Sequence, residues 1–574
     1  MSSGNPLGSV IRGSLTKGLE IRLHSDVSVE DMRVGKFLVI QGVRSRFFCM
    51  VTDVSLGTAN ERIIASPPNW EDTFLREVLA GSSTYGIVTL APMLMFTPED
   101  TEHTFNGKSA QSSAFSGNGL ASFQPQTATT MELLPVKTIP THFSQVYEAE
   151  EYDFRKVFGW EDDQQRKNFS IGKPLDMDVP VCIDLNRFVE RSNGVFGKSG
   201  TGKSFLTRLL LAGVIRKNAA VNLIFDMHSE YGWEAVAEGK EVSTVKGLKQ
   251  LFPDKVEVYT LDPEATKRRG VRDAQELYLN YEQIEVEDLK LCANELGVSD
   301  ASMDSASILY KQLGDRWIPQ LLGMTGDDIK LFCDENPGHV GSIAALQRKL
   351  MRLENLKYIR NARKDNYIKK IVQSLEAGKN VVIEFGTQSN MLSYMLVTNM
   401  ITRRIHDHYV TKADKFLHSK NPLDKPTPLM ITIEEAHRFL DSAVVQSTIF
   451  GTIARELRKY FVTLLVVDQR PSGIDNEIMS QIGTRITALL NDEKDIEAIF
   501  TGVSGGSVLR SVLAKLDSKQ QALILGHAVP MPVVIRTRAY DGVFYKEIGD
   551  VDWQEMSDVE VFAAAKLAKA DLGF

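Results

Sequence analysis

Apolar residues follow two different patterns along this chain, and the first occupies the N-terminal part. Residues 36–54 are rich in Val, Ile and Phe and are broken by Gly42, and further apolar runs follow at 85–95 and 131–137. Short runs of this kind, bounded by turn residues, are typical of strands joined in hairpins. We therefore predict a small antiparallel β-barrel over residues 1–150. Its Ser-, Gly- and Gln-rich segment at 105–130 has no aliphatic periodicity and is predicted to be a loop.

From residue 179 onward, short apolar runs alternate with helical spacing, as at 221–226, 380–385, 429–435 and 462–468. This alternation predicts an α/β fold with a buried, mostly parallel sheet. The stretch 275–375 instead has helical spacing throughout and is predicted to be a helical insertion. The α/β core is accordingly assigned to residues 151–274 and 376–545, and residues 546–574 are predicted to form a helical tail.

The overall composition places few limits on function. Apolar residues make up 43% of the chain and charged residues 24%, which is typical of a soluble globular protein. The net charge of −8 does not indicate a nucleic-acid binder, although a ring can line a basic pore while its outer surface stays acidic. The four cysteines are scattered without metal-ligand spacing, and no run is long and apolar enough to predict a signal peptide or membrane helix. We expect a cytoplasmic protein with no membrane contact.

One glycine-rich segment matches the pattern G-x-x-x-x-G-K-S at every fixed position. A strand-like NGVF precedes it and a helix-like FLTRLLLAGVIRK follows. In such a loop the backbone N–H groups and the helix N-terminus face phosphate oxygens, the lysine reaches the β- and γ-phosphates, and the serine holds Mg²⁺. The sequence therefore predicts ATP and Mg²⁺ bound by Gly197, Lys198, Ser199, Gly200, Thr201, Gly202, Lys203 and Ser204.

Polar residues that follow apolar strands supply candidates for the rest of the site. Glu434 and Glu435 end the run LMITIEE, and we predict Glu434 as the metal support and Glu435 as the base that polarises water; a solvated acidic pair is the alternative. Asp226 ends another strand and could either hold metal or cap a helix. Gln469 could sense the γ-phosphate or orient water. His437 fits a structural or coupling role better than a catalytic one.

Hydrolysis at a subunit interface needs a positive charge from outside the P-loop. Arg455 and Arg458 are three residues apart on a predicted helix, hence on one face, and either could act on a neighbouring subunit as an arginine finger. Arg191, just before the P-loop strand, is a third candidate. Simple solvent exposure is the alternative for each arginine.

These motifs together resemble the HerA family of hexameric DNA translocases, which are relatives of FtsK. The resemblance rests on the P-loop with an upstream arginine and on three further segments: D-x-H-x-E-Y at 226–231, E-E-A-H-R-F at 434–439, and A-R-E-L-R-K followed by D-Q-R-P-S at 454–472. It implies a RecA-like core and a homo-hexamer around double-stranded DNA, with ATP at the subunit interfaces. It also implies that Lys203 and Glu435 are essential, that Arg455 or Arg458 is the finger, that Arg191 is a second arginine acting in trans, and that Asp226 is a site carboxylate.

The resemblance leaves two functions open. Family members act with separately encoded partners, either a NurA-like nuclease or a defence effector such as a sirtuin-like NAD hydrolase or another nuclease, and the N-terminal barrel is the expected dock. The chain is therefore either a motor that translocates on DNA or an ATPase scaffold that switches an effector; a conjugation-type translocase is disfavoured because no membrane segment is predicted. Two departures from the family pattern are the loop at 105–130 and the segment 481–484, where a Q-C-N-like motif is usual.

Overall fold

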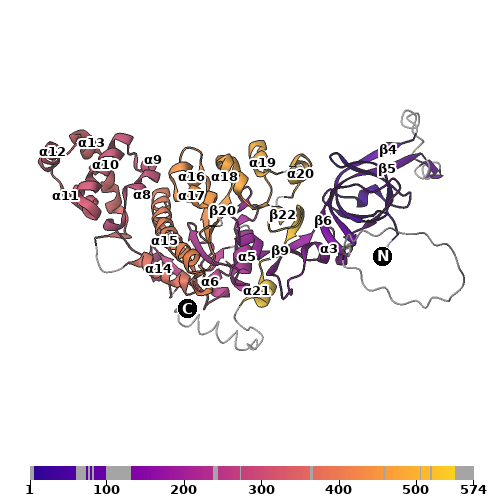
Figure 1. Cartoon of the computed structure of the whole chain (residues 1–574), viewed down its shortest axis with the longest axis horizontal. Coiled ribbons are helices and arrows are strands. Elements are labelled where there is room, and N and C mark those ends of the chain that lie inside the picture. Colours follow the sequence, from indigo (N-terminus) through magenta and orange to yellow (C-terminus); the bar gives the residue numbers. More distant parts are fainter. Residues whose placement is uncertain are drawn as a thin grey trace, which may run out of the picture. The chain divides into compact units, whose positions relative to one another are not determined.

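The computed structural model describes residues 5–59, 71, 73–74, 78–79, 83–98, 131–236, 244–271, 273–361, 366–456, 459–503, 506–517 and 520–549. Within them the chain forms two compact units, an N-terminal one up to Gly159 and a larger one that holds most of the remainder (Figure 1). The predicted loop at 105–130, most of the predicted tail and Arg458 lie outside the described residues.

The N-terminal unit is an antiparallel β-barrel, as predicted. Its described strands follow the order β2-β1-β7-β3-β4-β5, a pairing between β2 and β5 closes the ring, and β6 pairs with β5 alone. The predicted hairpin over 36–54 corresponds to β3 and β4, which pair in antiparallel register. The strands of this unit are β1 (Gly8–Ser14), β2 (Gly18–Leu23), β3 (Phe37–Gln41), β4 (Arg46–Thr58), β5 (Thr84–Pro98), β6 (Met131–Pro135) and β7 (Gln145–Glu148).

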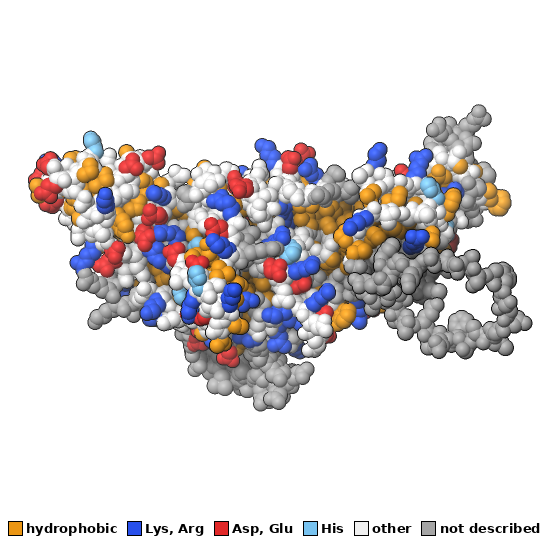
Figure 2. Space-filling view, viewed as in Figure 1, with side chains coloured by type: hydrophobic (Ala, Val, Ile, Leu, Met, Phe, Trp, Pro, Cys, Tyr) orange, Lys and Arg blue, Asp and Glu red, His pale blue; other side chains and the backbone are white. Residues whose placement is uncertain are grey.

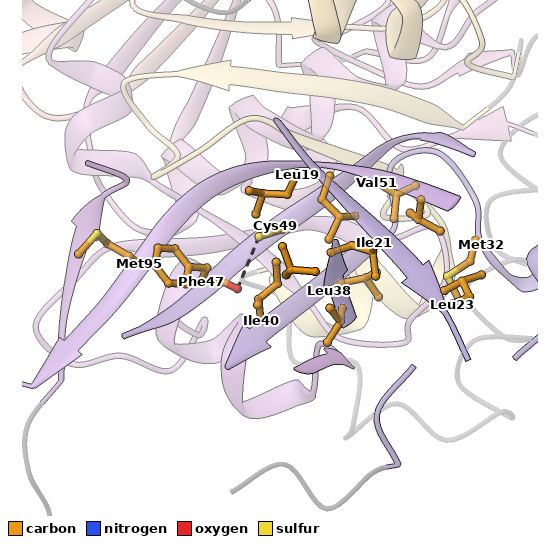
Figure 3. Packing of buried hydrophobic residues seen from close by; sticks show 14 residues of the cluster. Leu19, Ile21, Leu23, Met32, Leu38, Ile40, Phe47, Cys49, Val51 and Met95 are labelled. Atoms are coloured by element: carbon orange, nitrogen blue, oxygen red, sulfur yellow. Dashed lines mark hydrogen bonds between the residues drawn. The ribbon is translucent and has the colours of Figure 1, made fainter. Parts of the chain in front are cut away.

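Alternating side chains build the barrel interior. On β2, Leu19, Ile21 and Leu23 are buried while their neighbours are partly exposed, because successive strand residues point to opposite faces. They join Leu38, Ile40, Cys49 and Val51 in one apolar cluster (Figure 3). Strands β3 and β4 are buried on their outer face too, because Phe154 of helix α3 (Glu151–Phe158) packs edge-on against Phe37 and Phe48.

The larger unit is built on a mixed sheet, which confirms the predicted α/β class. In the described part this sheet has twelve strands in the order β15-β14-β18-β11-β19-β20-β10-β21-β22-β23-β8-β9, parallel from β15 to β21 and antiparallel at β21–β22, β22–β23 and β8–β9. The strands are β8 (Asn168–Pro174), β9 (Val181–Asp184), β10 (Asn193–Phe196), β11 (Val221–Asp226), β14 (Val256–Thr260), β15 (Gln275–Glu276), β18 (Asn380–Glu384), β19 (Leu429–Glu434), β20 (Val462–Asp468), β21 (Thr484–Thr487), β22 (Gln521–Gly526) and β23 (Val533–Thr537).

Helices of two groups surround or extend this sheet. The core helices are α4 (Leu185–Val189), α5 (Lys203–Arg216), α6 (Leu248–Leu251), α7 (Pro263–Arg268), α14 (Tyr367–Glu376), α15 (Met391–Ser419), α16 (His437–Leu440), α17 (Ile449–Glu456), α18 (Asn476–Gln481), α19 (Glu493–Ile499) and α21 (Gly542–Ile548). Helix α20 (Gly506–Leu513) is grouped for most of its length with the N-terminal unit. The helical lobe comprises α8 (Val286–Leu291), α9 (Ala293–Leu296), α10 (Asp300–Leu313), α11 (Trp317–Gly323), α12 (Gly326–Glu335) and α13 (Val340–Leu350) (Figure 1).

The helical lobe covers fewer residues than the helical insertion predicted at 275–375. Strand β15 belongs to the main sheet, and α14 packs on β18 and β11 of that sheet. At the base of the lobe, β16 (Leu279–Asn280) and β17 (Ile359–Arg360) form a short parallel pair. In the sequence, the described helical lobe therefore lies between β16 and β17.

Acidic side chains gather at the far end of the helical lobe. Figure 2 shows them over α12, whose sequence contributes the exposed residues Asp327, Asp328, Asp334 and Glu335. Such a surface repels a polyanion, so it is unsuited to contact a nucleic-acid backbone.

Candidate nucleotide-binding and hydrolysis site

The glycine-rich loop joins β10 to α5 at the carboxyl edge of the parallel sheet. Gly200 and Gly202 have φ values of 77° and 92°, a left-handed conformation that side chains disfavour, and α5 begins at Lys203 directly afterwards. Inside the loop, Thr201 Oγ1 donates to the Lys198 carbonyl at 2.7 Å and Lys203 Nζ donates to the same oxygen at 3.1 Å. The loop thus has the curled backbone and the helix N-terminus that a phosphate site needs.

A cleft of about 210 Å³ opens beside this loop. Its walls include Lys203 and Ser204 from the loop side, Glu434 and Glu435 from the end of β19, and Gln469 from the end of β20. Because β19, β20 and β10 are neighbours in the sheet, their carboxyl ends bring these distant residues together. The structure therefore places eight of the residues predicted from sequence in one cleft: Ser199, Gly200, Gly202, Lys203, Ser204, Glu434, Glu435 and Gln469.

Glu434 is a buried carboxylate of the site. Its Oε1 accepts a hydrogen bond from the Tyr231 hydroxyl at 2.9 Å, while Oε2 is buried without a hydrogen-bond partner among the described residues. Burial, with the nearby Asp226 charge, raises the pKa of Glu434 well above its usual range. A cation beside this oxygen would offset the cost of keeping the carboxylate ionised.

Glu435 is the more accessible carboxylate, with 26% of its side chain exposed. Its backbone has a φ of 48°, which costs a non-glycine residue about 1–3 kcal/mol and is found where surrounding structure enforces it. Its Oε1 accepts a hydrogen bond from Gln469 Nε2 at 3.2 Å. Gln469 is therefore in contact with the predicted base.

A buried aspartate that the sequence reasoning did not select holds His437 beside Glu435. Asp468, at the end of β20, accepts bonds from the His437 N–H at 2.7 Å and from its Nδ1 at 2.9 Å, and also from the Arg470 N–H at 2.7 Å. The hydrogen bond to Asp468 raises the pKa of His437. His437 Nδ1 lies 3.7 Å from Glu435 Oε2. The position of Asp468 after the apolar run VTLLVV was the signal that could have identified it.

Asp226 lies at the end of β11 but is absent from the walls of the cleft. Its carboxylate is fully buried and accepts the backbone N–H groups of Glu230, Tyr231 and Gly232 at 2.7, 2.8 and 3.0 Å. Burial raises its pKa, while these three bonds act in the opposite direction. Since its oxygens already close this turn, the geometry favours a capping role over a metal-holding one, although the element capped is a turn and not a helix.

The turn capped by Asp226 forms part of the wall of the cleft, which the sequence did not predict. The turn places His228 and Glu230 in the walls of the cleft, which Arg208 of α5 also lines. Arg208 is 3% exposed, and its Nε donates to the Glu230 carbonyl at 2.6 Å. Nothing in the helical pattern of α5 marks this arginine as different from a solvated one.

The two candidate trans-acting arginines that the structure describes, Arg191 and Arg455, are absent from the walls of the cleft. Arg191 precedes β10, whereas the P-loop follows it, and Arg191 borders a separate cavity of about 400 Å³ with Gly483 and His527. On α17, Arg455 Nη2 donates to the Val445 carbonyl at 3.5 Å, and its Nη1 is buried without a hydrogen-bond partner in the part of the chain that is described. For Arg191 and Arg455, a contribution to a nucleotide would have to come from another copy of the chain.

Comparison with known proteins gives matches over both units. Residues 169–405 match the family model described as "Helicase HerA, central domain", and residues 7–103 match the "HAS barrel domain". The chain is 23% identical over 433 residues to a Pyrococcus furiosus protein named "DNA double-strand break repair helicase HerA", covering 71% of this chain and 74% of that one. A Saccharolobus solfataricus protein of the same name is 26% identical over 433 residues, covering 74% and 78%.

Two solved structures are similar to this chain at TM-scores below 0.5. VirB4 of Thermoanaerobacter pseudethanolicus gives a TM-score of 0.40 at 16% identity and covers 65% of this chain and 96% of its own. The bacterial conjugative coupling protein TrwBdeltaN70 gives 0.44 at 12% identity and covers 68% and 92%. Among the described helices of the present chain, none has the length and apolarity to cross a bilayer.

Proposed function

We propose that this chain, a member of the HerA family, is an ATP-hydrolysing motor that translocates double-stranded DNA as a hexameric ring. The model of the HerA central domain and the model of the HAS barrel domain together match more than half of its residues. The observation that carries this proposal is the cleft that joins Lys203 of the P-loop to Glu435 and Gln469 at the neighbouring strand ends. Phosphate binding and activation of water need these two kinds of group on opposite sides of one space.

The residues of the cleft divide the proposed chemistry between them. The N–H groups at the start of α5 and the Lys203 ammonium would bind the β- and γ-phosphates. Glu435, held by Gln469 and still open to solvent, would polarise the attacking water. The Asp468–His437 pair beside it would fix the orientation of this segment.

A magnesium ion fits the remaining groups. Ser204 and Glu434 both border the cleft, and Glu434 Oε2 has no hydrogen-bond partner among the described residues. Mg²⁺ favours oxygen ligands, including water and substrate phosphates. Ser204 would hold the ion directly and Glu434 would support it, through water where needed. The ion would neutralise charge on the phosphates.

The decisive experiment is the ATPase rate of the full chain with and without linear duplex DNA. We expect DNA to raise the rate, and we expect the stimulation to weaken with added salt because contacts to the backbone release counterions. Glu435→Gln should keep nucleotide binding and lose turnover by roughly 10²-fold or more, as removal of a general base does.

An unchanged rate on adding DNA would contradict the motor and favour the second function, an ATPase scaffold that switches an effector or nuclease. The barrel supports such docking, since it is a compact unit with the strongly exposed apolar side chains Val43 and Leu56, at 84% and 82%. The Glu435→Gln variant then distinguishes two modes of action. Effector activity that persists without ATP hydrolysis would indicate a scaffold, whereas loss of both activities would indicate that the effector depends on hydrolysis.

A further inference from the structure

Strand β19 loses its neighbour on one side before it reaches the site. Its pairing with β11 ends at Thr432, whereas its pairing with β20 continues to Glu434. Buried backbone groups need hydrogen-bond partners. A single side chain serves both groups of Glu434: the Glu434 N–H donates to the Tyr394 hydroxyl at 2.8 Å, and that hydroxyl donates to the Glu434 carbonyl at 3.0 Å.

This contact bears directly on the orientation of Glu435. The Glu434 carbonyl and the Glu435 N–H belong to one planar peptide unit, so a bond that holds the carbonyl also fixes the plane from which Glu435 departs. Glu435 then takes its left-handed φ of 48°, a conformation that persists only where its surroundings enforce it. Loss of the hydroxyl would release the peptide and let the Glu435 carboxylate leave its position beside Gln469.

Tyr394 is itself firmly held. It is fully buried in the first turn of α15, and its ring packs edge-on against Phe385 at 5.3 Å and Phe439 at 5.5 Å between centroids. Burial raises the pKa of Tyr394 well above its usual range, so the hydroxyl keeps its proton and can donate.

Further along α15, two of its side chains bind the helical lobe. Arg403 Nη1 lies 3.0 Å from the buried Asp288 Oδ1 of α8, and Asn399 Nδ2 donates to the same oxygen at 3.2 Å. Helix α15 therefore joins the lobe to the end of β19.

We propose that Tyr394 is a positioning residue for hydrolysis: its hydroxyl clamps the Glu434 peptide and thereby aims the Glu435 carboxylate at the attacking water. The proposal rests on the assignment of Glu435 as the base in the proposed function. We expect the clamp to act on the catalytic step more than on nucleotide binding, because the groups proposed to bind the phosphates belong to the P-loop.

The test is Tyr394→Phe in the full chain, which removes the hydroxyl and keeps the ring. We expect kcat for ATP to fall at least tenfold, while KM, the affinity for a fluorescent ATP analogue and ring assembly change less than twofold. Tyr409→Phe is the matched control, since Tyr409 is also buried on α15 but lies about 22 Å along the helix; it should leave kcat within twofold.

A double-mutant cycle separates positioning from general damage. In the Glu435→Gln background, Tyr394→Phe should cause no further loss, because a residue that acts through Glu435 has nothing left to position. An added loss of the full single-mutant size, or an unchanged kcat in Tyr394→Phe, would overturn the proposal. Should the phenylalanine variant fold poorly, p-aminophenylalanine at 394 restores a hydrogen-bonding group and should recover turnover; failure to recover it in folded protein would also overturn the clamp.

The assignment of Glu435 as the base and that of Tyr394 as its positioning residue can be contradicted separately. Normal turnover in Glu435→Gln would remove the base assignment and, with it, the clamp. Lost turnover in Glu435→Gln with normal turnover in Tyr394→Phe would remove the clamp alone and leave the proposed function intact.

Discussion

His437 couples the stability of the site to pH. Its partner Asp468 raises the pKa of His437, so the folded protein binds this proton more tightly than the unfolded chain does. The resulting stabilisation is fully present below the unfolded value of about 6.5 and is lost as the pH rises through the higher folded value. We predict that His437→Gln lowers the melting temperature more at about pH 6 than at about pH 8.5.

The control for this prediction removes the other half of the pair. Asp468→Asn abolishes the charge that raises the pKa of His437, so in that background His437→Gln should give a melting-temperature difference with little dependence on pH. Thermal scans across the pH range measure both. The prediction would be contradicted if, with Asp468 intact, His437→Gln changed the melting temperature by the same amount at every pH. That result would show that His437 stays in one protonation state across this range.

The sequence predicts which residues meet at the site better than it predicts what each does. Glu434 and Glu435 follow an apolar strand, and that position places them beside the P-loop. What distinguishes them is the burial of one and the left-handed backbone of the other, both of which depend on Tyr231 and Tyr394 from distant segments. Asp226 has the same sequence setting, yet its oxygens are taken by the following turn, whose shape no local pattern reveals.

The attachment of the helical lobe through α15 gives a prediction at the scale of elements. Asp288 is buried on α8 and joins Arg403 and Asn399 of α15. Asp288→Ala leaves half-buried Arg403 with fewer acidic partners. We therefore expect the free energy of unfolding to fall by about 2 kcal/mol, which would lower the melting temperature by a few degrees.

The matched control is a carboxylate of the same lobe that faces solvent. Asp327 of α12 is 3.0 Å from Lys330 with 92% of its side chain exposed. Ion pairs of this kind contribute little because water and salt screen them, so Asp327→Ala should leave the melting temperature unchanged. Equal effects of the two substitutions would show that the buried network does not anchor α15.

Elements with a strong apolar signal were predictable, and short ones were not. The parallel strands β11, β18, β19 and β20 are mostly apolar runs because side chains on both faces of each strand are buried. Strand β15 has two exposed residues and joins the sheet only through pairing with β14, a long-range event without a local pattern. The amphipathic α14 reads like a helix of the lobe, although its apolar face packs on β18.

At the scale of the whole molecule, the separation of Arg191 from the P-loop within one chain predicts shared sites. The two lie at opposite ends of β10, and Arg191 borders a different cavity. If a neighbouring subunit supplies Arg191, each site is built from two chains in a head-to-tail arrangement, which closes into a ring when the rotation permits. Arg191→Ala and Lys203→Ala should then each abolish turnover. At any one site, the two substitutions would remove side chains that come from different subunits.

Mixing the two inactive variants tests this arrangement directly. In a randomly mixed ring, about a quarter of the interfaces would pair an intact Lys203 with an intact Arg191, so part of the ATPase activity should return. The same mixture assembled from Lys203→Ala and Glu435→Gln subunits is the control, because both residues belong to one cleft and no interface becomes complete. Recovery in the first mixture and none in the second places Arg191 in trans, whereas no recovery in either would assign Arg191 to its own chain and leave Arg455 and Arg458 as the candidates for the shared site.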